Sequence, residues 1–101
     1  MIAIHPGEIL REEYMAPLGL SASTLALELR IPASRVHEII NEKRGISVDT
    51  ALRLAKFFET DLSMWVNLQA QYEADSVDAQ KRTDMERIVP YRLLQGQRAS
   101  A

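Results

Sequence analysis

The amino-acid sequence predicts an all-α fold of five short helices, and three observations support this prediction. Apolar residues recur at the three- and four-residue spacing of a buried helical face through residues 4–74. Most of these segments begin at a residue that favours a helix start, namely Pro6, Ser21, Ser47 and Asp61. The chain has 101 residues, which is the size of one small domain with a single core.

The first predicted helix begins at Pro6, because the N–H that proline lacks would have no partner at the first helical position. Its inner stripe consists of Ile9, Leu10 and Tyr14. Its water-facing residues are Arg11, Glu12 and Glu13. Pro17 and Gly19 end the helix. His5 is interpreted as a helix-entry residue, because no second histidine or cysteine lies nearby to form a metal or catalytic site with it.

The next two predicted helices form a tight corner in the stretch from Ser21 to Arg44, and Ser21 is a suitable N-cap for the first of them. The buried face of this second helix consists of Leu25, Ala26 and Leu29. Ile31 and Pro32 turn the corner, because proline prevents the second helix from continuing. The inward residues of the third helix are Val36, Ile39 and Ile40. Two helices joined by so short a turn form a helix-turn-helix, whose second helix can lie in a DNA major groove.

Two further helices are predicted after this corner. Ser47 caps the fourth helix, and Asp49 near its start and Lys56 near its end match the helix dipole. The inner stripe of the fourth helix consists of Ala51, Leu54, Ala55 and Phe58. The fifth helix follows Asp61, and its apolar side consists of Met64, Trp65, Leu68 and Tyr72. We interpret this methionine and aromatic stripe as core rather than as a ligand site.

Residues 1–74 are therefore predicted to form a helix-turn-helix DNA-binding domain, and residues 75–101 a C-terminal extension that is partly disordered. Residues 76–87 are compatible with an additional short helix that ends before Pro90. The segments 87–89 and 91–94 are expected to be short extended pieces on either side of that proline. The last six residues are expected to be disordered.

The distribution of charge says more than the net charge of −2, which alone disfavours nucleic acid. Residues 30–56 carry three acidic side chains and six basic ones, namely Arg30, Arg35, Lys43, Arg44, Arg53 and Lys56. Residues 1–20 and 57–101 are each net acidic. Phosphate binding depends on the local field, so the basic middle of the chain is the predicted binding surface.

Composition also limits the compartment and the chemistry. The chain contains no cysteine, which excludes a disulfide framework and thiolate metal ligands. No segment has the form of a signal peptide or the length of a membrane span, so we expect a cytoplasmic protein. Two isolated histidines, no glycine-rich phosphate loop and no paired carboxylates at metal spacing leave no catalytic constellation and no cofactor site, so an enzyme is not expected.

Four sequence blocks resemble those of a known family. The stretch LALELRIPASRVHEIIN resembles the helix-turn-helix of the lambda-repressor-like, or XRE, family. More specifically, the flanking blocks HPGEILREEYMAPLGLS, KRGISVDTALRLAKFF and MWVNLQAQYE are similar to those of the HigA antitoxins. The resemblance is continuous over residues 4–74 and extends more weakly to residues 88–90. The flanking blocks, more than the corner itself, point to the antitoxins among the many users of this motif.

The resemblance implies a five-helix, lambda-repressor-like fold in a bacterial type II antitoxin. Such a protein binds and neutralises a HigB-like toxin that cleaves messenger RNA, and it represses the operon that encodes both. As a homodimer it would place two recognition helices in successive major grooves of double-stranded DNA, so the operator should be a near-palindrome. The dimer seam is expected on the fifth helix and the extension, at Trp65, Leu68, Tyr72 and Ile88.

The family pattern also implies which residues contact DNA. The positions that match base- and phosphate-contacting residues of the third helix are Ala33, Ser34, Arg35, His37 and Glu38. Arg35 is the main candidate for specificity, because its planar fork can pair with both acceptors of a guanine. Lys43 and Arg44 are expected to bind phosphate, as is the start of the second helix at Ser23 and Thr24. The alternative for Arg35 is a surface ion pair with Glu38 one helical turn away.

The sequence departs from the family pattern at three positions in the corner. Arg30 and Glu42 stand where glycine is common and where a positive φ is expected, at a cost of about 1 kcal/mol each. Pro32 stands where a hydroxyl cap is usual. Glu42 also adds a negative charge near the predicted DNA face. Two alternative functions therefore stay open: a toxin-neutralising protein that binds DNA weakly, and a free-standing repressor of the XRE family.

Overall fold

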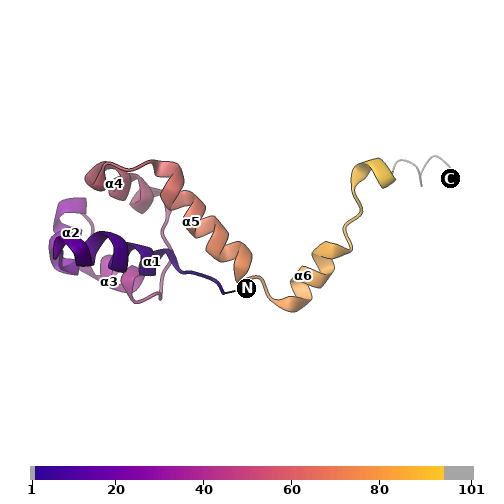
Figure 1. Cartoon of the computed structure of the whole chain (residues 1–101), viewed down its shortest axis with the longest axis horizontal. Coiled ribbons are helices and arrows are strands. Elements are labelled where there is room, and N and C mark those ends of the chain that lie inside the picture. Colours follow the sequence, from indigo (N-terminus) through magenta and orange to yellow (C-terminus); the bar gives the residue numbers. More distant parts are fainter. Residues whose placement is uncertain (1, 95–101) are drawn as a thin grey trace.

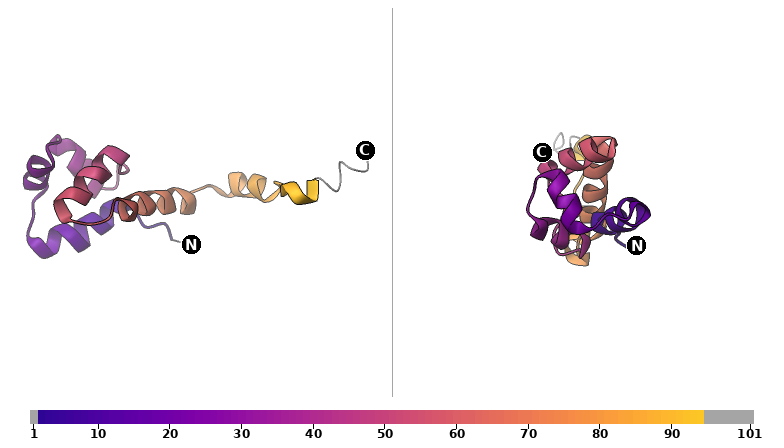
Figure 2. Two further views of the ribbon diagram at one scale, coloured as in Figure 1. Left: turned by 90° about the horizontal axis from the view of Figure 1, so that it is seen from above. Right: turned by 90° about the vertical axis from the view of Figure 1, so that its left-hand side faces the viewer.

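The computed structural model describes residues 2–94, and every regular element in this range is helical (Figure 1). The elements in chain order are α1 (Pro6–Ile9), the π-helical turn η1 (Leu10–Met15), the 3₁₀ turn η2 (Ala16–Leu18), α2 (Ala22–Leu29), α3 (Ala33–Ile40), α4 (Val48–Phe58), α5 (Leu62–Asp75) and α6 (Ala79–Glu86). The first helical segment and α2 to α5 pack together, whereas α6 lies apart from them (Figures 1 and 2). The predicted all-α, five-helix fold with a short additional helix is confirmed.

The first helical segment is less regular than the sequence predicts. It begins as an α-helix at Pro6, but the backbone N–H of Ala16 bonds to the carbonyl of Arg11, five residues back, as in a π-helix. This wider turn buries Leu10 and Met15 together. On a regular α-helix these two residues would face different directions, so the helical period did not identify Met15 as core. Pro17 cannot donate a backbone hydrogen bond, and the segment closes as a 3₁₀ turn before Gly19, whose φ is 64°.

Trp65 of α5 is at the centre of the core and has no exposed surface. Its indole N–H donates to the hydroxyl of Thr60 at 2.8 Å, and the rings of Tyr14 and Phe58 lie against it, with centroids 4.9 and 6.4 Å away. The buried core otherwise consists of Leu10, Met15, Ala22, Leu25, Ala26, Leu29, Val36, Ile39, Ile46, Ala51 and Leu54. The placement of Trp65 at a dimer seam is therefore wrong, because a side chain fully enclosed by its own protomer has no surface to offer a partner.

Four helical ends share one backbone geometry, in which a residue in the left-handed region follows the helix. These residues are Gly19, Arg30, Glu42 and Glu59, with φ between 55° and 64°. In each case the next N–H reaches five residues back, for example Ile31 to Ala26 at 3.1 Å and Lys43 to Glu38 at 2.8 Å. The positive φ predicted at Arg30 and Glu42 is confirmed. The one at Glu59 was not predicted, because neither glycine nor asparagine marks the end of α4.

The extension after α5 contains α6, which confirms the short helix expected within residues 76–87. Residues 91–94 form a helical turn, with the N–H groups of Leu93 and Leu94 bonded to the carbonyl of Pro90 at 3.0 and 3.1 Å. The extended conformation expected there is wrong, because proline has the φ of a first helical residue and favours a helix start. Every side chain from residue 78 to 93 is exposed. The disorder expected of the last six residues concerns positions outside the described range.

Candidate nucleic-acid interface

Helix α3 packs through Val36 and Ile39, each 1% exposed, and this fixes which of its residues can reach a ligand. The predicted DNA-contacting residues of α3 that are exposed are Ala33, Ser34 and His37, and those that are half-buried are Arg35 and Glu38. Ser23 and Thr24 are exposed in the first turn of α2, and Lys43 and Arg44 are exposed directly after α3. Pro32 precedes α3 without a side-chain hydrogen bond to the helix, so the N–H groups of its first turn receive no side-chain cap.

The start of α1 fixes the C-terminal end of α3. A Cβ atom on Gly7 would lie 1.8 Å from the carbonyl oxygen of Ile39, so only glycine allows the two backbones to approach this closely. Arg11 was predicted to face water, but its guanidinium donates to the carbonyl oxygen of Ile40 and lies 3.5 Å from the carboxylate of Glu42. The negative charge of Glu42 is therefore paired by Arg11. The roles of Gly7 and Arg11 were not predicted from the sequence, because their partners on α3 lie about thirty positions away in the chain.

His5 caps the start of α1 from a buried position, and the residue is 5% exposed. Its Nδ1 accepts a hydrogen bond from the N–H of Gly7 at 2.9 Å, and its ring meets that of Tyr72 edge-on at 4.7 Å. Burial lowers the pKa of His5 below 6.5, and the nearby charge of Glu42 opposes this shift. The neutral imidazole is thus the form that caps α1, which confirms the interpretation of His5 as a helix-entry residue.

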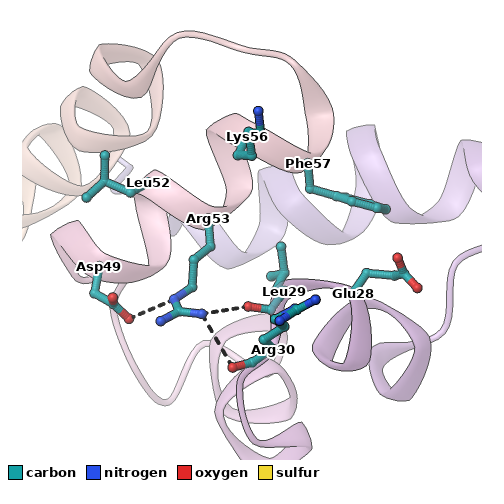
Figure 3. A pocket seen from close by; sticks show the side chains of 8 residues that line it. All are labelled: Glu28, Leu29, Arg30, Asp49, Leu52, Arg53, Lys56 and Phe57. Carbon is teal, nitrogen blue, oxygen red and sulfur yellow. Dashed lines mark hydrogen bonds and ion pairs between the residues drawn. The ribbon is translucent and has the colours of Figure 1, made fainter.

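Asp49 in the first turn of α4 pairs with two arginines. Its Oδ2 lies 3.3 Å from Nη1 of Arg35 and 3.2 Å from Nε of Arg53. Nη1 of Arg53 also donates to the carbonyl oxygens of Leu29 and Arg30, at 2.9 and 3.4 Å, where α2 ends (Figure 3). The alternative pairing of Arg35 with Glu38 is not found. Asp49 competes for Arg35, and Glu38 pairs instead with Arg44 at 3.1 Å.

These ion pairs divide the six basic residues of the middle segment into two groups. Arg35, Arg44 and Arg53 are matched by carboxylates. Of these six, the three that make no ion pair within the described range 2–94 are Arg30, Lys43 and Lys56, and all three are exposed. Much of the positive charge seen in the sequence is therefore neutralised locally, and the surface offers fewer free cations to a phosphate backbone than the residue count suggests.

A groove of about 430 Å³ lies between α2 and α4, beside this network (Figure 3). Leu29, Leu52 and Phe57 form its apolar part, and Arg53 crosses one side of it. In the part of the chain that the structure describes, no group of three or more histidine, cysteine or acidic side chains is arranged to hold a metal ion. None of the helices in residues 2–94 combines the length and apolar character that a membrane crossing requires.

Comparison with known proteins gives one family and several relatives. A family model described as Helix-turn-helix matches residues 10–65. The chain is 51% identical over 83 residues to Virulence-associated protein I of Dichelobacter nodosus, an alignment that covers 82% of this chain and 77% of the relative.

Solved structures of antitoxins are similar over most of the chain. The Pseudomonas aeruginosa antitoxin HigA with the higBA promoter is 40% identical with a TM-score of 0.80, covering 88% of this chain and 98% of that one. An addiction module antidote protein of a HigA family from Coxiella burnetii is 44% identical with a TM-score of 0.80, covering 90% of this chain and 100% of that one. The similarity thus extends well beyond the helix-turn-helix.

Proposed function

This chain belongs to the helix-turn-helix family, and on that premise we propose that it is a HigA-like antitoxin that binds operator DNA. As a homodimer it represses the operon that encodes it, and it neutralises a HigB-like ribonuclease toxin. Two copies of α3 then enter successive major grooves of a near-palindromic site about one helical turn apart, or a multiple of it. The family acts by binding, and the chain is not an enzyme.

The observation that carries the DNA-binding part is the outer side of α3, held in a fold shared with a HigA antitoxin solved with its promoter. Val36 and Ile39 are buried, so Ser34, His37 and the half-buried Arg35 are left facing outward. We assign base contacts to Ala33, Ser34, Arg35, His37 and Glu38, and phosphate contacts to Ser23, Thr24, Lys43 and Arg44. The exposed N-terminal turn of α2 and the exposed segment after α3 support the phosphate assignment.

The protein-binding part of the proposal is supported by the extension. Ile88, Val89 and Leu93 are 72%, 44% and 49% exposed, which leaves apolar surface uncovered along a segment that lies apart from the core. Such surface is typical of a segment that binds another chain. We place the homodimer seam on Leu68, Tyr72 and Ile88. Size-exclusion chromatography of an Ile88→Asp variant tests this, and an unchanged dimer would remove Ile88 from the seam.

The DNA-binding part is tested with the full chain and labelled duplexes that span the region upstream of its own gene. At physiological salt, binding to one of these duplexes should be about a thousandfold or more tighter than binding to an unrelated duplex of equal length. Equal affinity for all duplexes would contradict operator binding. Co-expression with the neighbouring reading frame tests the antitoxin part, because the two proteins should purify together.

One observation favours a second candidate function, a toxin-neutralising protein that binds DNA weakly. Three of the six basic residues between positions 30 and 56 are already paired with carboxylates, which lowers the positive field over α3. This candidate predicts co-purification of the neighbouring protein without any sequence-specific shift of upstream DNA. The converse result, a specific shift and no co-purifying partner, would instead indicate a free-standing repressor.

A further inference from the structure

The carboxylate of Asp49 joins the predicted reading helix to the rest of the domain. It contacts Nη1 of Arg35 on α3 at 3.3 Å, although the two residues are fourteen positions apart. The same oxygen accepts from Nε of Arg53, four residues further along α4, at 3.2 Å. Arg53 is itself held by the carbonyl oxygens of Leu29 and Arg30 at the end of α2. A continuous path of polar contacts thus connects the end of α2, through α4, to the side chain of Arg35.

The contact leaves Arg35 able to bind something else. A guanidinium carries five N–H donors, and Asp49 lies against only one of its nitrogens. The side chain of Arg35 remains 30% exposed while it makes this pair. Two further N–H groups are therefore available to the O6 and N7 acceptors of a guanine, which lie side by side in the major groove. Because Asp49 accepts from this guanidinium, it restricts the rotation of the group and so fixes the direction of the N–H groups that remain available to a guanine.

We propose that Asp49 is a positioning residue for sequence recognition: its contact with Arg35, anchored by Arg53, holds the Arg35 guanidinium in the orientation that pairs with a guanine. The inference rests on the proposed binding of operator DNA. It adds a specificity-determining residue outside the helix-turn-helix corner, on α4, which carries none of the residues assigned to base contact. Asp49 therefore acts through Arg35 and makes no base contact of its own.

The sign of the effect separates this role from two simpler ones. Asp49 carries a negative charge that opposes the phosphate backbone, so its neutralisation should raise affinity for unrelated DNA. Loss of positioning should at the same time lower the preference for guanine. A residue that only competed with DNA for Arg35 would, when neutralised, raise affinity for all duplexes and leave the preference unchanged. A residue that only stabilised the fold would lower both.

The test uses the full chain and a duplex selected by the unmodified protein from a random pool. Affinities are measured for this duplex, for copies with each guanine replaced in turn, and for unrelated DNA. Asp49→Asn should lower the preference at one guanine by about tenfold, within the roughly 5- to 150-fold that one such pair supplies. Its affinity for unrelated DNA should rise about twofold. Asp61→Asn is the matched control, because it removes the same charge at a helix start where the side chain makes no capping hydrogen bond.

A double-mutant cycle with Arg35→Ala completes the test. In the Arg35→Ala background, Asp49→Asn should cause no further loss of preference at that guanine, since both changes remove the same contact. Asp49→Glu should restore part of the preference. An Asp49→Asn protein that keeps the full preference, or that loses it equally with and without Arg35, would overturn the inference. If the unmodified protein selects no sequence at all, the proposed function fails, and the inference fails with it.

Discussion

Arg30 provides a direct test of the backbone argument, because it has a left-handed conformation, φ 59° and ψ 46°, that glycine adopts without strain. A side chain with a Cβ atom loses about 1–2 kcal/mol in this region. Glycine relieves that strain but gains about 0.4–1 kcal/mol of conformational freedom in the unfolded chain. The difference predicts that Arg30→Gly stabilises the protein by about 0.5–1 kcal/mol, which for a domain of this size raises the melting temperature by about 2–8 °C.

The other interactions of Arg30 should survive the substitution. Its N–H bonds to the carbonyls of Ala26 and Leu27, and its carbonyl accepts from Arg53, so all of these contacts belong to the backbone. Arg30→Ala separates strain from side-chain effects, because it removes the charge but keeps the Cβ atom, and its stability should stay close to that of the unmodified protein. Glu28→Gly, at an exposed position within α2, should be destabilising by about 1 kcal/mol.

Urea unfolding followed by circular dichroism measures all three variants under identical conditions. An Arg30→Gly protein that is no more stable than Arg30→Ala would show that the backbone at this position is not strained, since the two variants differ only in the Cβ atom.

Three further predictions follow from the contacts of α1 and from the segment after α3. Gly7→Ala should destabilise the protein by about 1–3 kcal/mol or more in urea unfolding, because its Cβ atom would lie 1.8 Å from the carbonyl oxygen of Ile39; a stable variant would contradict the close approach. The pKa of His5 in the folded protein is below 6.5, so the contribution of its cap to stability is complete above pH 6.5 and is lost as the pH falls through the folded pKa. The variant His5→Asn keeps a capping side chain but should lack this part of the pH dependence of stability. Lys43→Ala should weaken binding to all DNA sequences and reduce the salt slope by about one, whereas a change confined to one sequence would assign Lys43 to base contact.

Local sequence rules identified the helices and most of their buried faces, and the family pattern identified two of the unusual backbone positions. The residues Leu25, Leu29, Val36 and Ile39 were placed correctly because a regular α-helix repeats every 3.6 residues. Met15 was missed because the π-helical turn changes this period for one turn. The positive φ at Glu59 was missed because neither glycine nor asparagine marks that position in the sequence.

The candidate site was predicted only in part. Its residues lie close together in the sequence, but some of the side chains that contact them come from distant parts of the chain. Sequence spacing offered Glu38 as a partner for Arg35, whereas the pair is made by Asp49 from another helix. The clamp that Arg11 forms on the end of α3 joins positions 29 residues apart. Contacts of this kind are made by side chains that η1 and α4 bring to α3 from distant parts of the chain, and a single sequence carries no local signal for them.

The role of α3 in reading DNA is measured by the binding of the unmodified protein and of Arg35→Ala to a selected duplex and to unrelated DNA. The unmodified protein should strongly prefer the selected duplex, while Arg35→Ala should keep its fold and its affinity for unrelated DNA to within a few-fold but lose the preference. An Arg35→Ala protein that still discriminates between the two duplexes as the unmodified protein does would contradict the assignment of α3 as the helix that reads DNA.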